Sequence, residues 1–134
     1  MAGYMTKLQG YLYEGECVNG AAKAVENGML MVMGADNKLV LPTADAETKL
    51  VCKEVTEIFE GVVAYRFVVK ALAGNYYFVE NSIPAFEKDA DVLPVGKQLR
   101  AHPILVGEEF VTSKVTGTPA VGTAYGVKAD GTIG

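Results

Sequence analysis

The feature that most constrains the fold is a series of short runs rich in β-branched and aromatic residues, separated by turn residues at intervals of about 8 to 12 positions. Runs at this spacing are typical of an all-β sandwich or barrel. The length of 134 residues matches one domain, and a chain of this size buries roughly two-thirds of its unfolded surface. We therefore expect residues 1–134 to form a single, mainly β domain, an antiparallel β-sandwich or β-barrel.

Two Asn-Gly pairs, Asn19-Gly20 and Asn27-Gly28, separate the first runs. Asn-Gly provides the two positive-φ residues of a type I′ hairpin turn. We therefore predict a meander at the start of the chain. Its three successive antiparallel strands would cover residues 10–18, 21–26 and 29–34, and a fourth strand, residues 38–42, would end at Pro42.

Residues 44–60 fit two alternatives, a strand or one short helix. Val51, Cys52, Val55, Ile58 and Phe59 follow a helical spacing, with Thr43 as a possible N-cap and Gly61 as a stop. The same stretch is rich in β-branched residues and leads directly into a clear strand, which favours a strand slightly.

The second half of the chain is predicted to continue with strands joined by turns. The predicted elements are a hairpin of residues 62–71 and 76–81 around the turn 73–75, a surface loop at 82–98, strands at 99–106 and 108–115 flanking Val106-Gly107, and a last pair, 121–129 and 131–134, at the Asp130-Gly131 turn.

The C-terminal stretch, about residues 117–134, is rich in Gly and Thr. Its bulky residues Val121, Thr123, Tyr125 and Val127 alternate with Gly122, Ala124 and Gly126, which would leave one face of a strand nearly bare. A bare face allows close approach by another surface. The segment is therefore either a last strand within its own sheet or a contact with a neighbouring subunit, and the first alternative is favoured.

The N-terminal stretch, about residues 1–10, is a candidate arm. Tyr4, Met5, Tyr11 and Tyr13 lie in or near it, and Tyr and Met are enriched at protein interfaces. Together with Val121, Tyr125 and Val127 they are the candidate partner-interface residues, although for the N-terminal residues a role as ordinary strand or core residues is slightly favoured.

Composition argues against several classes of protein. Charged residues interrupt every apolar run well before the roughly 20 residues of a membrane helix, and no signal-peptide core follows the N-terminus, so cytoplasmic synthesis is expected. The net charge is −4 and the twelve basic residues are scattered, which argues against nucleic-acid binding. Cys17 and Cys52 lack metal-ligand spacing, and we expect buried free thiols rather than a disulfide.

Catalytic motifs are not found in the sequence. His102 is the single histidine. A zinc site is therefore not expected, and a catalytic triad could be built only around His102. No phosphate-binding loop is present, and no cofactor is expected. The alternative function is a small β-barrel enzyme or ligand-binding module in which His102, Arg100 and a carboxylate form a pocket.

As a whole, the sequence resembles the decoration, or cement, proteins of tailed bacteriophages. The resemblance lies in "VENGMLMVMGADNKLVLP", in "EIFEGVVAYRFVV" followed by "YYFVEN", and in "LVGEEFVTSKVTG" leading to "YGVKADGTIG". It covers most of the chain with short elements of common residues, so no residue role transfers by position.

The resemblance implies a non-enzymatic structural protein that binds the outer surface of a capsid and bridges major capsid subunits. Such a protein is made in the host cytoplasm, becomes part of the virion, and self-associates, with a trimer as one arrangement. Its extended termini would be the natural elements to contact neighbours, because an extended segment can pair with an exposed sheet edge.

Overall fold

The computed structural model describes residues 5–9, 15–34, 37–42, 48–57, 62–72, 74–80 and 92–134. These residues form strands and turns, and no α-helix is found among them, which confirms the predicted mainly β fold class. The strands are β1 (Met5–Gln9), β2 (Gly15–Asn19), β3 (Val25–Glu26), β4 (Leu30–Met33), β5 (Lys38–Val40), β6 (Lys49–Glu57), β7 (Val63–Ala71), β8 (Tyr76–Glu80), β9 (Val92–Leu93), β10 (Gln98–Pro103), β11 (Glu109–Thr112) and β12 (Ala124–Tyr125).

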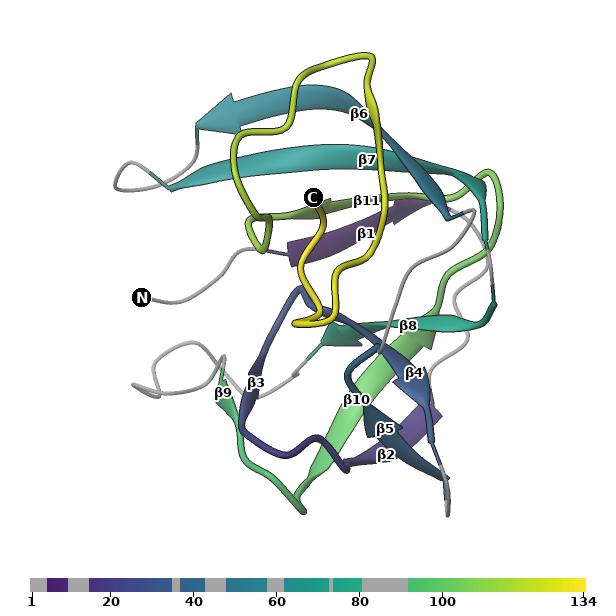
Figure 1. The fold of residues 1–134 in the computed structure, drawn as a ribbon, viewed down its shortest axis with the longest axis vertical. Coiled ribbons are helices and arrows are strands. Elements are labelled where there is room, and N and C mark those ends of the chain that lie inside the picture. Colours follow the sequence, from purple (N-terminus) through teal and green to yellow (C-terminus); the bar gives the residue numbers. More distant parts are fainter. Residues whose placement is uncertain are drawn as a thin grey trace.

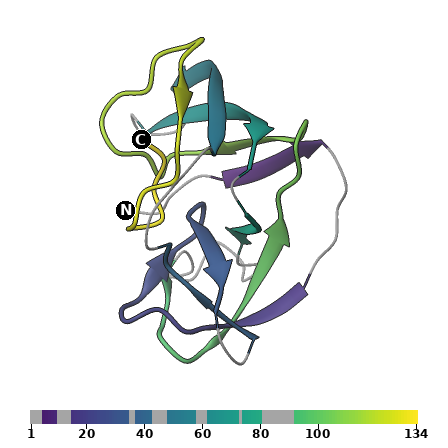
Figure 2. The ribbon, with the colours of Figure 1, turned by 45° about the vertical axis from the view of Figure 1, so that its right-hand side comes forward.

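The strands form a five-stranded sheet and a closed barrel (Figure 1). The sheet has the order β1-β11-β7-β6-β12, and the barrel has the order β10-β2-β5-β4-β8. Neighbouring strands are antiparallel except for β2 and β5, which run parallel. A separate two-stranded ladder joins β3 to β9. Figures 1 and 2 show the sheet above the barrel, with the C-terminal segment running alongside the sheet.

The larger hydrophobic core lies between the sheet and the barrel. Phe67 and Phe110 belong to the sheet and Phe78 belongs to the barrel, and all three are fully buried. The ring centroid of Phe110 lies 6.0 Å from that of Phe67 and 5.1 Å from that of Phe78. Phe110 therefore connects the two parts of the fold through direct aromatic contacts. A second cluster includes residues of the barrel strands and of the β3–β9 ladder: Cys17, Ala21, Val25, Met31, Leu39, Val79, Leu93, Leu99 and Ala101.

A buried side-chain amide holds the chain after β2 against the segment before β10. Asn19 is fully buried, and its Nδ2 donates to the carbonyl of Leu93 at 2.7 Å. Its Oδ1 accepts from the N–H of Ala21 at 3.0 Å. The side chain thus provides hydrogen-bond partners for a buried carbonyl and a buried N–H of the backbone.

Replacing this amide is expected to destabilise the fold. Asn19→Ala should lower the free energy of unfolding by about 1–3 kcal/mol, because a buried carbonyl and a buried N–H lose their partner. Urea unfolding followed by circular dichroism measures the change, and Asn75→Ala, at an exposed asparagine, is the matched control. Equal stability of the two variants would contradict this role for Asn19.

The predicted N-terminal meander is wrong. β2 pairs with β10 and β5, β3 pairs with β9, and only β4 and β5 pair as consecutive strands of the predicted series. The Asn-Gly pairs do not form type I′ turns, since Gly28 has a positive φ of 89° and Asn27 does not. Gly20 instead permits close approach to β5, because a Cβ there would lie 2.7 Å from that of Lys38.

The predicted hairpin of residues 62–71 and 76–81 is also wrong. β7 pairs with β6 and β11 in the sheet, whereas β8 pairs with β4 and β10 in the barrel. The chain therefore crosses between the two parts after Ala71. β10 and β11, which flank Val106-Gly107, also lie in different parts.

The two alternatives for residues 44–60 are resolved over the described part of that stretch, where β6 is a strand of nine residues. Of the predicted surface loop 82–98, residues 82–91 lie outside the described residues, and the remainder contains β9 and the start of β10. A turn is present at Asp130-Gly131, but it is the four-residue turn 128–131 rather than the predicted two-residue turn, since Asp130 has no positive φ. Gly131 has a φ of 84° and donates its N–H to the carbonyl of Lys128 at 2.9 Å.

Candidate docking surface

The candidate interface residues occupy different environments. Tyr4, Tyr11 and Tyr13 lie outside the described residues, and of Met5 only the backbone is described, paired with Thr112 in the sheet. Val121 is 59% exposed, Tyr125 is half-buried, and Val127 is fully buried in the main core. Val121 is therefore available to a partner, whereas Val127 is a core residue.

The C-terminal segment is anchored in the fold through Val127 and Ile133, and Val115, just before the segment, forms a parallel bridge with Ile133. Val127 and Ile133 are fully buried and lie opposite each other in an antiparallel bridge. The N–H of Thr116 donates to the carbonyl of Ile133 at 2.8 Å, and the N–H of Leu30 donates to that of Gly131 at 2.9 Å. The last residues are thus part of the core of the fold.

Asp130 stabilises the turn between these anchors. Its Oδ1 accepts hydrogen bonds from the hydroxyl and the N–H of Thr132, at 2.6 Å and 3.0 Å. The hydroxyl contact is the main cause that lowers the pKa of this carboxyl below its ordinary value. The carboxylate is therefore charged, and the turn hydrogen-bonded, at neutral pH.

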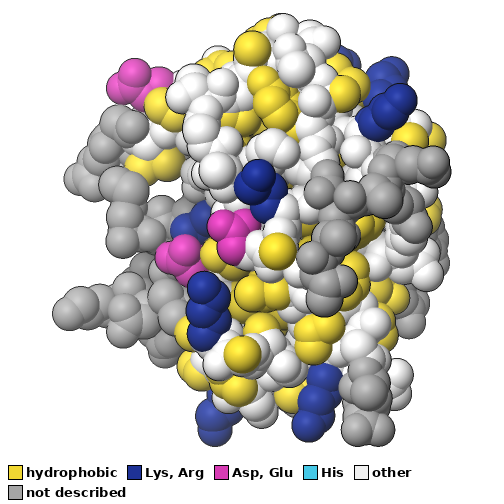
Figure 3. Space-filling view, in the orientation of Figure 1, with side chains coloured by type: hydrophobic (Ala, Val, Ile, Leu, Met, Phe, Trp, Pro, Cys, Tyr) yellow, Lys and Arg dark blue, Asp and Glu magenta, His cyan; other side chains and the backbone are white. Residues whose placement is uncertain are grey.

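Between Val115 and Val127, residues 117–124 form an exposed segment that we call the terminal loop. All of its residues are exposed except Pro119. The N–H of Ala120 donates to the hydroxyl of Tyr125 at 2.7 Å, and Cys52 of β6 bonds to Thr123 and Gly122 through its N–H and carbonyl. The loop is thus held on the edge of the sheet while its outer side stays open. In Figure 3, hydrophobic side chains are scattered among uncharged polar groups over the face that this segment crosses.

The predicted alternation over residues 121–127 does not persist as one strand face. β12 contains only Ala124–Tyr125, and Gly122, with a φ of 89°, turns the chain before it. The backbone therefore presents Val121 to solvent and Val127 to the core. The sequence pattern places Val121 and Val127 on one face of a strand. Their environments are opposite because the segment is a loop with a short strand.

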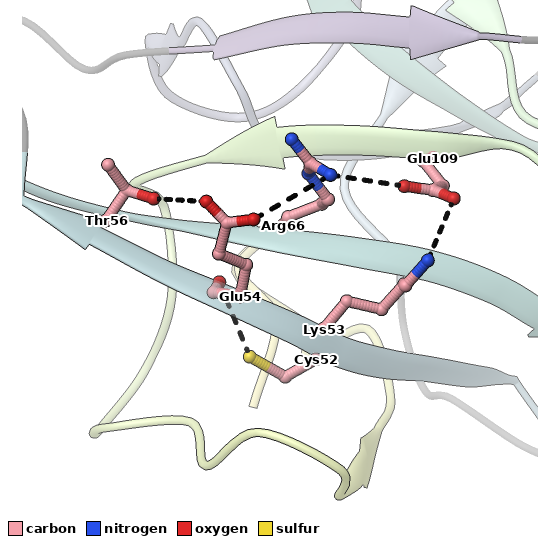
Figure 4. A network of polar contacts seen from close by, with 6 residues as sticks. All are labelled: Cys52, Lys53, Glu54, Thr56, Arg66 and Glu109. Carbon is pink, nitrogen blue, oxygen red and sulfur yellow. Dashed lines mark hydrogen bonds and ion pairs between the residues drawn. The ribbon is translucent and has the colours of Figure 1, made fainter.

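A charged network covers the opposite side of the sheet from the core (Figure 4). Lys53 Nζ lies 3.2 Å from Glu109 Oε2, and Arg66 Nη1 lies 3.9 Å from Glu109 Oε1 and 3.8 Å from Glu54 Oε2. The hydroxyl of Thr56 donates to Glu54 at 2.9 Å. The network joins three strands, and each exposed pair contributes at most about 1 kcal/mol.

This network depends on a bulge in β6. Between Cys52 and Glu54 the strand has one more residue than β7, namely Lys53. Figure 4 shows Lys53 and Glu54 directed to the side of Arg66, while Cys52 points the other way. Sequence reasoning did not find this network, because the bulge reverses the expected alternation at Lys53.

The adjacent carboxylates Glu108 and Glu109 serve different parts of the fold. Glu109 joins the charged network, whereas Glu108 is 4% exposed and accepts a hydrogen bond from the N–H of Leu105 at 2.8 Å. The two groups therefore do not converge on a common point.

His102 and Arg100, the residues of the alternative enzyme or ligand pocket, lie on β10. His102 is only 4% exposed and stands opposite Phe78, and Arg100 is half-buried opposite Glu80. The His102 ring is thus covered in this structure. Over the described ranges, no group of three or more His, Cys, Asp or Glu residues is placed to hold a metal ion, and no helix is long and apolar enough to span a membrane.

The two cysteines are buried free thiols, which confirms the prediction from their spacing. Cys17 belongs to the second core cluster and Cys52 to the main core. Burial raises the pKa of both thiols, so both are protonated at neutral pH.

No protein-family profile, curated protein or solved structure matches this chain. The function must therefore be argued from the surfaces of the chain itself, together with the sequence resemblance to capsid decoration proteins.

Proposed function

We propose that this protein is a non-enzymatic structural protein of a tailed-phage virion, which binds the outer capsid surface and stabilises the shell by bridging major capsid subunits. The observation that carries the proposal is the terminal loop. It is exposed over nearly its whole length and lies between Val115 and Val127, each of which forms a bridge with the fully buried Ile133. A loop of this kind is ordered before binding, so it loses little conformational entropy on contact.

The composition of the terminal loop suits contact with a broad protein surface. Its residues are small, apart from Val121, and glycines at positions 117 and 122 leave open space where a Cβ would be. A partner can therefore come close to the backbone, and Val121 supplies an apolar contact at the centre. Copies that self-associate on the shell would add avidity, since each further contact becomes effectively intramolecular.

Val121 is the residue with which to test the proposal. We expect Val121→Asp to weaken binding to capsids at least about tenfold, because the substitution puts a charge at an apolar contact. The measurement is cosedimentation with purified capsids of the source phage that lack this protein. Val95→Asp is the matched control, since Val95 is 49% exposed on a turn before β10.

Three results of this experiment lead to different conclusions. Binding by wild type and by Val95→Asp, with loss in Val121→Asp, would support the terminal loop as a capsid contact. Equal binding by wild type and both variants would show that the terminal loop is not part of the interface, without contradicting the proposed binding to capsids. Absence of saturable binding by wild type would overturn the proposed function itself.

A further inference from the structure

A rigid turn between β10 and β11 displays two adjacent large apolar side chains. Leu105 is 46% exposed and Val106 is 62% exposed. The N–H of Glu108 donates to the carbonyl of Leu105 at 3.1 Å, and Gly107 has a φ of 95°. This is the pattern of a type II turn, in which the third position requires a positive φ. We call residues 105–108 the Leu-Val turn.

The Leu-Val turn is fixed from two directions. Val69 of β7 accepts from the N–H of Gly107 at 2.8 Å and donates to the carbonyl of Glu108 at 2.9 Å. From within, the carboxylate of Glu108, which is 4% exposed, accepts from the N–H of Leu105 at 2.8 Å. A buried carboxylate that orders an exposed turn is a costly arrangement for a connection with no further role.

The chemistry of the turn differs from that of an ordinary surface turn. Gly, Pro, Asn, Asp and Ser dominate turns because of their backbone preferences and their polarity. Single exposed apolar residues are normal on a protein surface, but here two adjacent ones are presented on a fixed backbone. Such a preordered apolar projection loses little conformational entropy when it enters a pocket.

The exposed charges close to the turn on the neighbouring strands include two lysines, whereas Glu109, which follows the turn, is half-buried and ion-paired with Lys53 and Arg66. Lys70 is exposed and follows Val69, the residue that exchanges two hydrogen bonds with the turn. Lys49, also exposed, is the ladder partner of Ala71. A complementary surface would therefore combine an apolar pocket with carboxylates at its rim.

We propose that the Leu-Val turn inserts Leu105 and Val106 into an apolar pocket of a protein partner whose carboxylates face Lys70. The inference rests on the proposed function, under which the pocket belongs to the capsid shell. A protein pocket fits better than a lipid surface, because the projection consists of two side chains on a chain with a net charge of −4.

The chain contains a matched control for this test. Residues 94–97 form a second turn with Val and Gly at the same positions, Val95 and Gly96. The N–H of Lys97 donates to the carbonyl of Pro94 at 3.3 Å. The backbone N–H and carbonyl of Asn19 bond to this turn in the same pattern in which those of Val69 bond to the Leu-Val turn. Val95→Ser and Val106→Ser therefore change the same residue in the same backbone setting.

The experiment titrates purified capsids lacking this protein with wild type, Val106→Ser, Leu105→Ser/Val106→Ser and Val95→Ser. We expect Val106→Ser to weaken binding about tenfold, the double variant to weaken it further, and Val95→Ser to bind as wild type. Lys70→Gln should reduce the dependence of binding on salt, because it removes the charge that faces the rim. Circular dichroism and thermal unfolding confirm that each variant is folded.

The outcomes separate this inference from the proposed function. Wild-type affinity in both Val106→Ser and the double variant, with capsids that bind wild type, would overturn the role of the Leu-Val turn and leave decoration intact. Equal weakening by Val95→Ser would overturn it as well, because the effect would not be specific to this turn. Capsids that do not bind wild type would overturn both.

Discussion

Phe110→Ala is expected to lower the free energy of unfolding by about 3–5 kcal/mol, among the largest effects available to a single substitution in this chain. Phe110 is fully buried and contacts Phe67 in the sheet and Phe78 in the barrel. Its removal opens a cavity where the two parts meet, and neither side can close it without moving a strand. Because the main core includes residues of both parts, we expect sheet and barrel to unfold in one transition.

Urea unfolding measures this effect with two probes, far-ultraviolet circular dichroism for the strands and tyrosine fluorescence for packing, since the chain has seven Tyr and no Trp. Val111→Ala is the control on the same strand, because Val111 is only half-buried and alternates with Phe110. We expect it to cost less than about 1.5 kcal/mol. Two separate transitions, one for each probe, would contradict a core shared by sheet and barrel.

The fold class could be predicted from the sequence, but the pairing of strands could not. The runs that became β2, β4, β7 and β10 are rich in residues that favour strands, and their positions were predicted approximately. Their partners are distant in sequence: β2 pairs with β10, and β4 pairs with β8. Local turn signals indicate hairpins between consecutive strands, and a barrel that closes through distant strands gives no local signal.

The two alternatives for residues 44–60 have a physical origin in the bulge of β6. Leu50 and Cys52 face the core with a period of two, and Lys53 then adds one residue before Glu54. The added residue places Val55 three positions after Cys52, so the apolar spacing over this part of the segment resembles that of a helix. A period-two pattern interrupted once cannot be distinguished by spacing alone from a helical stripe.

The candidate docking surface could be predicted only in part. The Gly- and Thr-rich composition drew attention to the terminal loop, but Val121 and Val127 look alike in sequence and have opposite environments. The Leu-Val turn was located as a Val106-Gly107 turn, yet its exposure depends on contacts that the sequence does not show, those of Val69 on β7 and of the Glu108 side chain within the turn. Exposure is a property of tertiary contacts, so composition could not reveal it.

A chain that ends at Lys128 is expected to lose cooperative folding, which excludes this truncation as a test of capsid binding. It removes Ile133, which is fully buried, and the carbonyls that accept from Leu30 and Thr116. Ile133→Ala alone should cost about 2–5 kcal/mol, and the truncation more, against a typical total stability of about 5–15 kcal/mol. Thermal unfolding and limited proteolysis measure the loss.

Val121→Ser provides the contrast within the same segment, because Val121 is exposed and its replacement should change stability by less than about 0.5 kcal/mol. A truncated chain with a wild-type transition would show that the last residues are dispensable for the core, and would contradict the role of Ile133 as the bridge partner of Val115 and Val127 on the two sides of the terminal loop. Loss of folding on truncation, together with a stable Val121→Ser, would mean that the C-terminal segment has two distinct roles. Its last residues complete the core, and the core fixes the conformation of the terminal loop that a partner would contact.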